Sequence, residues 1–449
     1  MQKKLKTSIE FINHASILIS GDDISILSDP WYQGNAFNKG WDLLHQTNDF
    51  ETEKILNRTT HIWLSHEHPD HFSIIFFKKF KSKIIDRSIK ILFQETKDKR
   101  VINFLKKQSF ECLELKFNKD IYLTNTFSVK CIKDGFYDSG LLIKSNNEKI
   151  LNLNDCEVNT SSRVSEIKSI VGEVDVLLTQ FSFAAWKGGE KNTKWRKLAA
   201  NEKLRTMKLQ TENFKPNYII PFASFMYFSN YENCYLNDAV NKPLDVHLFL
   251  KNTPVKVIIM KPNDILGGDF ENISINSAIN FWNEKYQSIS QKRLNSFKLI
   301  SIEELLSNFK IYCNRITKKN SLWLMRVLKT ISPIPIFRPV IIKIHDLELN
   351  VKFDYISKKF FKTSEEAHIS MSSESLNFLF KNNFGFDTLT VNGCFEEIKK
   401  NGFMSSTKTL AIENLNNLGF YISIKTIFNL NLLSLFFKRL YSVKKKIND

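Results

Sequence analysis

Three histidines and an aspartate lie within six consecutive residues of the segment Ser65-His66-Glu67-His68-Pro69-Asp70-His71. The segment follows Thr60–Leu64, an apolar run typical of a β-strand, so these side chains project from a turn at a strand end. Neutral imidazole nitrogens and carboxylate oxygens are donors that zinc, iron and manganese accept. We therefore predict a metal site formed by His66, His68, Asp70 and His71.

The spacing of these residues predicts two cations rather than one. His66 and His68 are two positions apart and can face one cation, whereas Asp70 and His71 turn toward a second. The alternative is a polar loop that is rich in histidine for no chemical reason. The chain holds only nine histidines in 449 residues, so chance grouping is the less favoured explanation.

The pattern H-x-H-x-D-H after a strand resembles the signature of the metallo-β-lactamase superfamily, and the resemblance covers about residues 8–245. It implies an α/β fold, a four-layer αβ/βα sandwich with a dinuclear metal site between the sheets. It also implies that Asp155, which follows the strand Lys149–Leu153, bridges the two metals. Asp70 and Asp155 are then the catalytic carboxylates.

Two histidines usual in the superfamily are missing from this chain. After the strand Phe127–Ile132 no histidine follows, and Asp134 first, or Asp138 second, is expected to replace it. The last histidine, expected near Pro221, is also missing, and Glu232 is a candidate replacement. Carboxylates in place of imidazoles favour iron or manganese over zinc, although zinc also accepts them.

Flanking segments are similar to the cytidine-monophosphate N-acetylneuraminate hydroxylase group and its bacterial relatives. They keep their order over more than 200 residues and include Asp29-Pro30-Trp31, Gly40-Trp41, Asp134-Gly135, Asp155-Cys156 and Pro221-Phe222-Ala223. The resemblance implies oxygen-dependent hydroxylation of a sugar or sugar nucleotide, with electrons from a Rieske centre. None of the six cysteines has the Cys-x-His or Cys-x-x-His spacing of such a centre, so a separate electron donor is expected.

Two other functions stay open on these residues. A hydrolase would use the same ligands to activate a bridging water against a phosphodiester, amide or lactone. A non-enzymatic lipid carrier or scaffold would have lost its metal, which the presence of five core ligands disfavours. The metals are therefore expected to be two divalent ions, iron or zinc, with manganese also considered.

Residues for a small anionic substrate are less clearly marked. Trp31 and Trp41, in a glycine-rich segment, could form the floor of a pocket or anchor the core. Lys194 belongs to a basic run that could bind phosphates, although a solvated helix face is the commoner explanation. Asp138 is also a candidate for contact with the substrate. His14 is interpreted as a structural imidazole held by the backbone rather than as a ligand.

The elements that position these residues alternate between strands and helices in the front half. Helices are expected at Ser73–Lys81, Lys97–Gln108 and Lys194–Asn213, and further strands at Ser8–Phe11, Ser16–Ser20, Ile24–Ser28, Ile89–Phe93, Gly140–Lys144, Val174–Thr179 and Tyr218–Ile220. We divide the chain into a metallo-β-lactamase-like domain (1–245), a helical connector (246–331) and an α+β accessory domain (332–449). The last part faintly resembles a sterol-carrier-protein domain.

The chain carries a net charge of +17, of which about +12 lies in residues 246–449. Such an excess is compatible with anionic ligands, but no nucleic-acid-binding module is recognised and nucleic acid is not expected. An amphipathic helix near 424–441 ends in lysines; it packs on its own domain or lies on an anionic membrane. No run is long enough to span a bilayer, and a cytoplasmic protein is expected.

Overall fold

The computed structural model describes residues 5–424, and these form two compact units. The first unit comprises residues 5–184, 193–229 and 234–294. The second comprises residues 185–192, 230–233 and the chain from residue 295 onward. The predicted C-terminal helix near 424–441 lies outside the described residues, apart from its first position.

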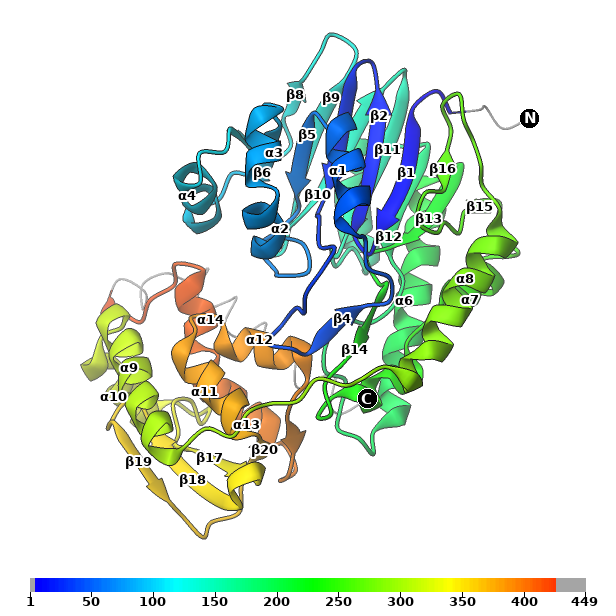
Figure 1. The fold of residues 1–449 in the computed structure, drawn as a ribbon. Coiled ribbons are helices and arrows are strands. Elements are labelled where there is room, and N and C mark those ends of the chain that lie inside the picture. The colour runs from blue at the N-terminus through cyan, green and yellow to red at the C-terminus, as the bar shows by residue number, and fades with distance from the viewer. Residues whose placement is uncertain (1–4, 425–449) are drawn as a thin grey trace. The chain divides into compact units, whose positions relative to one another are not determined.

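The first unit contains two seven-stranded sheets (Figure 1). The first sheet has the order β16-β1-β2-β3-β5-β6-β7, and its strands β3, β5, β6 and β7 are parallel. Its strands are β1 (Ser8–Asn13), β2 (Ser16–Gly21), β3 (Ile24–Ser28), β5 (His61–Leu64), β6 (Lys90–Gln94), β7 (Cys112–Leu115) and β16 (Ile265–Leu266). The metal-binding motif predicted above therefore follows a central parallel strand.

The second sheet has the order β15-β13-β12-β11-β10-β9-β8. Its strands are β8 (Asp120–Tyr122), β9 (Ser128–Asp134), β10 (Asp138–Ser145), β11 (Glu148–Asn154), β12 (Val176–Gln180), β13 (Tyr218–Phe222) and β15 (Lys256–Val257). Strands β9, β10 and β11 form an antiparallel meander, after which β12 and β13 run parallel to β11. The strand that leads to Asp155 is therefore central as well.

Alternation of side chains along the first sheet explains the layers. Leu18, Leu27, Ile62 and Ile91 point outward and pack with apolar residues of the covering helices. These helices are α1 (Asp49–Arg58), α2 (Ile74–Lys79), α3 (Lys81–Asp86) and α4 (Arg100–Lys107). Their neighbours in sequence, such as Ile17, Ile26, Trp63 and Leu92, point inward and join the larger core shared with the second sheet.

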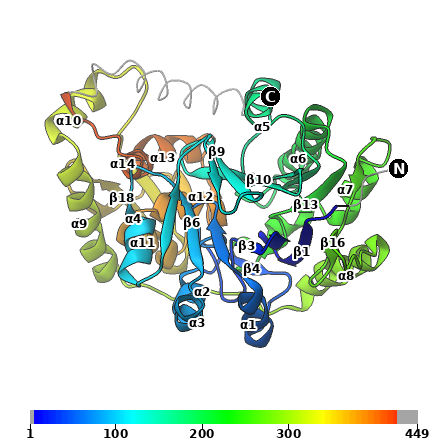
Figure 2. The same ribbon diagram turned by 90° about the horizontal axis from the view of Figure 1, so that it is seen from above.

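Helices α5 (Ser161–Val171) and α6 (Thr193–Phe214) contribute to that larger core from the second sheet. Seen from above, helices lie on the outer faces of the sheet pair, which gives the αβ/βα sandwich that the sequence predicts (Figure 2). The strands β4 (Trp41–Leu43) and β14 (Met226–Phe228) form a separate, short antiparallel pair.

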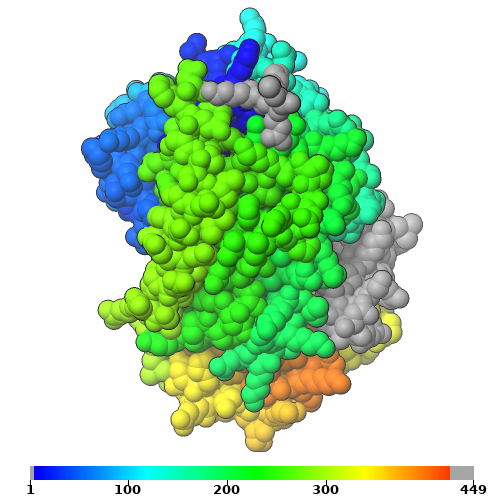
Figure 3. Space-filling view, turned by 90° about the vertical axis from the view of Figure 1, so that its right-hand side faces the viewer, coloured from blue at the N-terminus to red at the C-terminus, as the bar shows by residue number. Residues whose placement is uncertain are grey.

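The first unit continues beyond the boundary expected at residue 245. Helices α7 (Pro243–Phe249) and α8 (Ile275–Gln287), with the 3₁₀ turns η1 (Cys234–Ala239) and η2 (Ser288–Gln291), belong to it. They cover much of the face shown in Figure 3. Ala278, Ile279, Trp282 and Tyr286 of α8 are buried in the core of the sandwich, so the predicted helical connector is divided between the two units at residue 294.

The second unit holds a five-stranded mixed sheet with the order β19-β18-β17-β20-β21. The strands are β17 (Val340–Ile344), β18 (Leu349–Asp354), β19 (Lys359–Lys362), β20 (Ile369–Met371) and β21 (Glu396–Glu397), joined by the 3₁₀ turn η3 (His345–Leu347). The helices are α9 (Ile302–Lys319), α10 (Leu322–Ile331), α11 (Ser373–Lys381), α12 (Gly385–Asn392), α13 (Gly402–Leu410) and α14 (Ile412–Asn417). An α+β accessory part is thus present, and its sterol-carrier likeness stays a prediction.

Helices α1 and α5 were not expected from the sequence. Polar residues dominate α1, and its start depends on Asn48, whose side chain caps the helix together with Glu51. Within residues 5–424, no helix has the length and apolar character needed to cross a bilayer.

Candidate metal centre

The loop after β5 bends so that its polar side chains gather at one end of the sandwich. The amide nitrogens of His71 and Phe72 both donate to the carbonyl of His68, at 3.0 and 2.7 Å, which forms a tight helical turn. Ser73 then caps α2 by accepting a hydrogen bond from the Phe76 amide. This geometry directs His66, Asp70 and His71 into the protein, where all three are buried.

The end of β11 brings the acidic partner to the same place. The pairing register with β12 shifts between Asn152 and Asn154, and Asn154 adopts a positive φ of 49°. Asparagine tolerates this left-handed conformation better than most residues. The bend turns Asp155 toward the loop after β5, and its Oδ2 lies 3.3 Å from Nε2 of His71.

Two overlapping groups of side chains are arranged as a cation would need. One consists of His14, Asp70 and His71, and the other of His66, His71 and Asp155, each with donor atoms within 4.8 Å of one another. Oδ2 of Asp70 lies 3.1 Å from Nε2 of His71 and 3.4 Å from Nε2 of His14. His71 is therefore at the centre of the cluster.

His68 and Asp138 lie beside His66. Nδ1 of His68 is 2.9 Å from Nε2 of His66, and Oδ1 of Asp138 is 3.7 Å from the same His66 nitrogen. Burial raises the pKa of Asp138 to about 7. The side chains of His68 and Asp138 thus both approach Nε2 of His66.

Residues outside the ligand groups fix the orientation of the histidine side chains. Asp29, at the end of β3, accepts hydrogen bonds from the Ser65 amide at 2.8 Å and the Ser65 hydroxyl at 2.7 Å. The same carboxylate lies 3.0 Å from Nδ1 of His71 and accepts a hydrogen bond from Nδ2 of Asn154. It thereby joins the ends of β3, β5 and β11 and leaves Nε2 of His71 facing the cluster.

A second chain of hydrogen bonds positions Asp155. Nε2 of Gln180, at the end of β12, donates to Oδ1 of Asp155 at 3.1 Å. Lys203 of α6 in turn donates from Nζ to Oε1 of Gln180. The lysine fixes which way the Gln180 amide faces, so the amide presents its NH₂ group to the Asp155 carboxylate.

The electrostatics of the cluster are those of a site built for positive charge. Burial, together with His71 and His68, holds the pKa of His66 well below 6.5, so its imidazole is neutral. Against the effect of burial, His71 and His14 hold the pKa of Asp70 well below its ordinary value. Also against burial, Asp70, Asp155 and Asp29 raise the pKa of His71.

The donor set fits metal ions. Oδ1 of Asp70 and Nδ1 of His14 are fully buried and have no hydrogen-bond partner within the described part of the chain, whereas Nε2 of His71 has only the nearby carboxylate oxygens of Asp70 and Asp155. An unsatisfied buried acceptor is costly, and here the unsatisfied Oδ1 belongs to a carboxylate among imidazoles. A bound cation would satisfy such atoms.

Asp134, the first choice for the missing ligand, does not join the cluster. One of its oxygens pairs with Nε and Nη2 of Arg163, at 3.0 and 2.9 Å, and the other accepts a hydrogen bond from the Glu157 amide at 2.6 Å. Both oxygens are thus already bonded. The second choice, Asp138, is the carboxylate that faces the histidines.

The structure also differs from the prediction that the backbone holds the ring of His14. No backbone group holds its ring among the described residues; Nε2 faces Asp70, and Nδ1 has no partner. In the sequence, the feature that could have indicated His14 as a ligand is the polar dipeptide Asn13-His14 between two strands. His14 joins the ligand candidates, whereas Glu232 does not, because it pairs with His345 at 3.4 Å within the second unit.

The residues predicted to bind substrate lie in different surroundings in the structure. Trp31 is buried and its ring packs edge-on against His14, with centroids 5.4 Å apart. Trp41 is buried against Phe37, whose ring in turn lies 5.5 Å from that of His68. Both tryptophans therefore anchor the surroundings of the histidines. Lys194 is exposed in the first turn of α6.

Comparison with known proteins finds relatives over part of the chain. No family model matches it. The chain is 24% identical over 281 residues to the inactive cytidine monophosphate-N-acetylneuraminic acid hydroxylase of Homo sapiens, covering 58% of this chain and 54% of that protein. It is 25% identical over 281 residues to the Mus musculus hydroxylase of the same name, covering 58% and 47%. The chain thus spans about half the length of these curated relatives.

Among solved structures, the diiron β-hydroxylase CmlA from Streptomyces venezuelae matches with a TM-score of 0.41 and 12% identity. The match covers 57% of this chain and 53% of CmlA. The sequence relatives agree with the predicted resemblance to the hydroxylase group. The sheet order and layers agree with the metallo-β-lactamase sandwich.

Proposed function

We propose that the first unit is a metalloenzyme with a dinuclear centre that hydroxylates a small anionic sugar or sugar nucleotide in an oxygen-dependent reaction. The observation that carries the proposal is the convergence of Asp155, from the second sheet, on His71, from the first, at 3.3 Å. The names of the curated relatives support hydroxylation and a sugar nucleotide as the substrate class.

Each cation would have its own ligands in this arrangement. His66, His68 and Asp138 would hold one, and His14, Asp70 and His71 the other. Asp155 lies between the two sets and would bind both. When bound, the metal pair would supply activation of oxygen if it is iron, or of water if it is zinc.

The protein's own contribution is orientation and charge. Asp29 keeps Nε2 of His71 directed toward the centre, and Gln180 orients the Asp155 carboxylate. Carboxylates at Asp70, Asp138 and Asp155 make the site harder than an all-histidine site, which favours iron. Trp31 packs edge-on against His14, and Trp41 packs against Phe37, whose ring contacts that of His68.

A second candidate is a metal-dependent hydrolase acting on a phosphodiester, amide or lactone. It is favoured by the absence of paired Cys-x-His and Cys-x-x-His ligands from the full sequence. Under the hydroxylase proposal, electrons would come from a separate donor protein. Neither proposal involves nucleic acid.

Metal analysis combined with oxygen dependence tests the choice. The protein should be purified without added metal, its metals quantified by emission spectrometry, and turnover of sugar nucleotides measured by mass spectrometry with a chemical reductant. Bound iron, and a product 16 mass units heavier that forms only in air, support hydroxylation. Two zinc ions with turnover retained in anaerobic buffer would reject it in favour of the hydrolase.

A further inference from the structure

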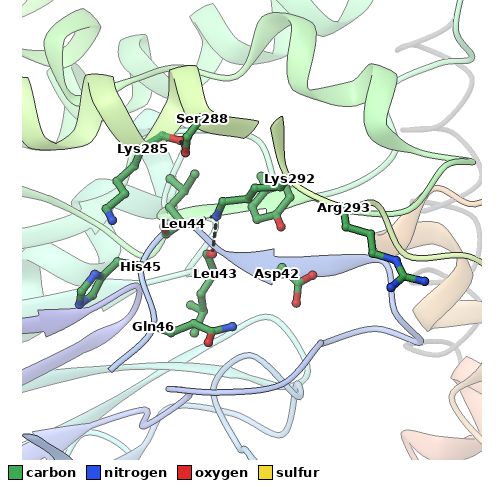
Figure 4. A pocket seen from close by; sticks show the side chains of 10 residues that line it. Asp42, Leu43, Leu44, His45, Gln46, Lys285, Ser288, Lys292 and Arg293 are labelled. Carbon is green, nitrogen blue, oxygen red and sulfur yellow. Dashed lines mark hydrogen bonds between the residues drawn. The ribbon is translucent and has the colours of Figure 1, made fainter. Parts of the chain in front are cut away.

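A basic pocket of about 470 Å³ lies in the first unit, outside the ligand groups described above. We call it the β4–η2 pocket, because β4 and its continuation to Gln46 form one wall and the end of α8, with η2 and the following residues, forms the other (Figure 4). Tyr227 of β14 completes the lining. None of the ligand residues lines it.

Cationic side chains dominate the lining. Lys285, Lys292 and Arg293 come from the α8–η2 wall, and Asp42 is the single carboxylate of the ten lining residues. Lys285 reaches from α8 toward His45, and Arg293 lies at the opposite end of the pocket (Figure 4). All three cationic side chains therefore extend from the α8–η2 wall and are spread along the length of the cavity.

In the part of the chain that the structure describes, these cations are not paired with carboxylates. Within the described residues, no ion pair joins Lys285, Lys292 or Arg293 to an acidic side chain. Nζ of Lys292 lies 3.4 Å from the Leu43 carbonyl and 4.4 Å from the centroid of the Tyr227 ring. Nζ of Lys285 lies 5.2 Å from the centroid of the Phe281 ring.

The positive charges also act on one another. Burial and the nearby Lys285 lower the pKa of Lys292, while Asp42 opposes them. Burial, Lys285 and Lys292 likewise lower the pKa of His45. Like charges held together at a half-buried site cost free energy, and a bound anion would remove that cost.

We propose that the β4–η2 pocket binds the phosphate group of a small phosphomonoester. Two ammonium groups and a guanidinium along one wall of a cavity supply the positive charge that a phosphate dianion needs, and arginine adds paired donors suited to phosphate. The volume accommodates a phosphate with a sugar attached. This site is separate from the metal centre, so its failure would leave the proposed function standing.

Calorimetric titration of the purified full-length protein tests the assignment. Inorganic phosphate, ribose 5-phosphate and uncharged ribose serve as probes at low ionic strength. We expect saturable binding of both phosphates and none of ribose; tighter binding of ribose 5-phosphate identifies a phosphomonoester as the ligand, and equal binding identifies free phosphate. No saturable binding of either phosphate would overturn the proposal.

Variants assign the binding to this pocket. Lys285→Gln/Arg293→Gln should weaken phosphate binding at least about tenfold. The control Lys107→Gln/Lys251→Gln removes the same charge from exposed positions of the same unit and should keep the affinity within about twofold. Equal affinity in both double variants would reject the site. If the first variant does not fold, Arg293→Gln alone, at an exposed position, should still weaken binding about threefold.

Discussion

Asp29 and His71 are joined by a buried contact of 3.0 Å between the aspartate Oδ2 and Nδ1 of the ring, although they are 42 residues apart. The other ring nitrogen faces Asp70 and Asp155 at 3.1 and 3.3 Å. The carboxylate therefore sets both the orientation and the tautomer of the imidazole at the centre of the cluster.

Replacing Asp29 should weaken the metal centre without removing a ligand. In Asp29→Asn, the ring loses its anionic partner and the Ser65 hydroxyl and Asn154 amide lose an acceptor. We expect metal affinity to fall about 10- to 100-fold, measured by competition with a chelator. Asp49→Asn, at an exposed position, is the control and should bind metal as the wild type does. Unchanged affinity in Asp29→Asn would show that the contact does not support metal binding.

Asp138 and Asp134 should respond differently to the same substitution. Asp138→Asn removes a proposed ligand and should reduce bound metal by about one ion per chain, measured by emission spectrometry. Asp134→Asn breaks the pair with Arg163 and should cost about 1–3 kcal/mol of stability while leaving metal content unchanged. The reverse pattern, with metal lost only in Asp134→Asn, would restore Asp134 as the ligand.

His61 of β5 should make the stability of the first unit sensitive to acid. Burial, and secondly Lys90, lower the pKa of His61 from 6.5 to about 4. Between these values the unfolded chain takes up a proton that the folded chain does not, so stability falls as the pH drops from about 6.5 toward 4.

The variant His61→Gln lacks this proton uptake. Its loss of stability between pH 7.5 and 5 should be smaller than that of the wild type by about 1 kcal/mol, after allowance for solvent screening. Urea unfolding with a chelator in all samples measures this without a contribution from metal. An equal loss in His61→Gln would refute the assignment.

The sequence predicts the part of the site that is local. His66, His68, Asp70 and His71 are adjacent along the chain, and a strand before them is enough to place them together. Asp155 follows from the superfamily resemblance, because nothing in its own segment separates a ligand from a residue in a turn.

What the sequence does not predict depends on contacts between distant elements. The sequence favours Asp134 over Asp138, and the pairing of Asp134 with Arg163 on α5, a helix that the sequence does not predict, reverses that order. Similarly, His14 is a ligand candidate only because the end of β1 lies beside the loop after β5. The first unit continues past residue 245 because α8 packs into its core. In the sequence, the helical pattern of α8 is the same as that of the neighbouring helices and does not show to which unit it belongs.

If side chains from both sheets hold a pair of cations, the metal stoichiometry of the protein shows it most directly. The wild type, loaded with ferrous iron under anaerobic conditions or with zinc and then desalted, should retain two ions per chain. His68→Ala should lose at least one metal ion, and Asp155→Ala should weaken the binding of both metal ions. A wild-type protein that retains no metal, or two variants that retain two ions each, would contradict the account.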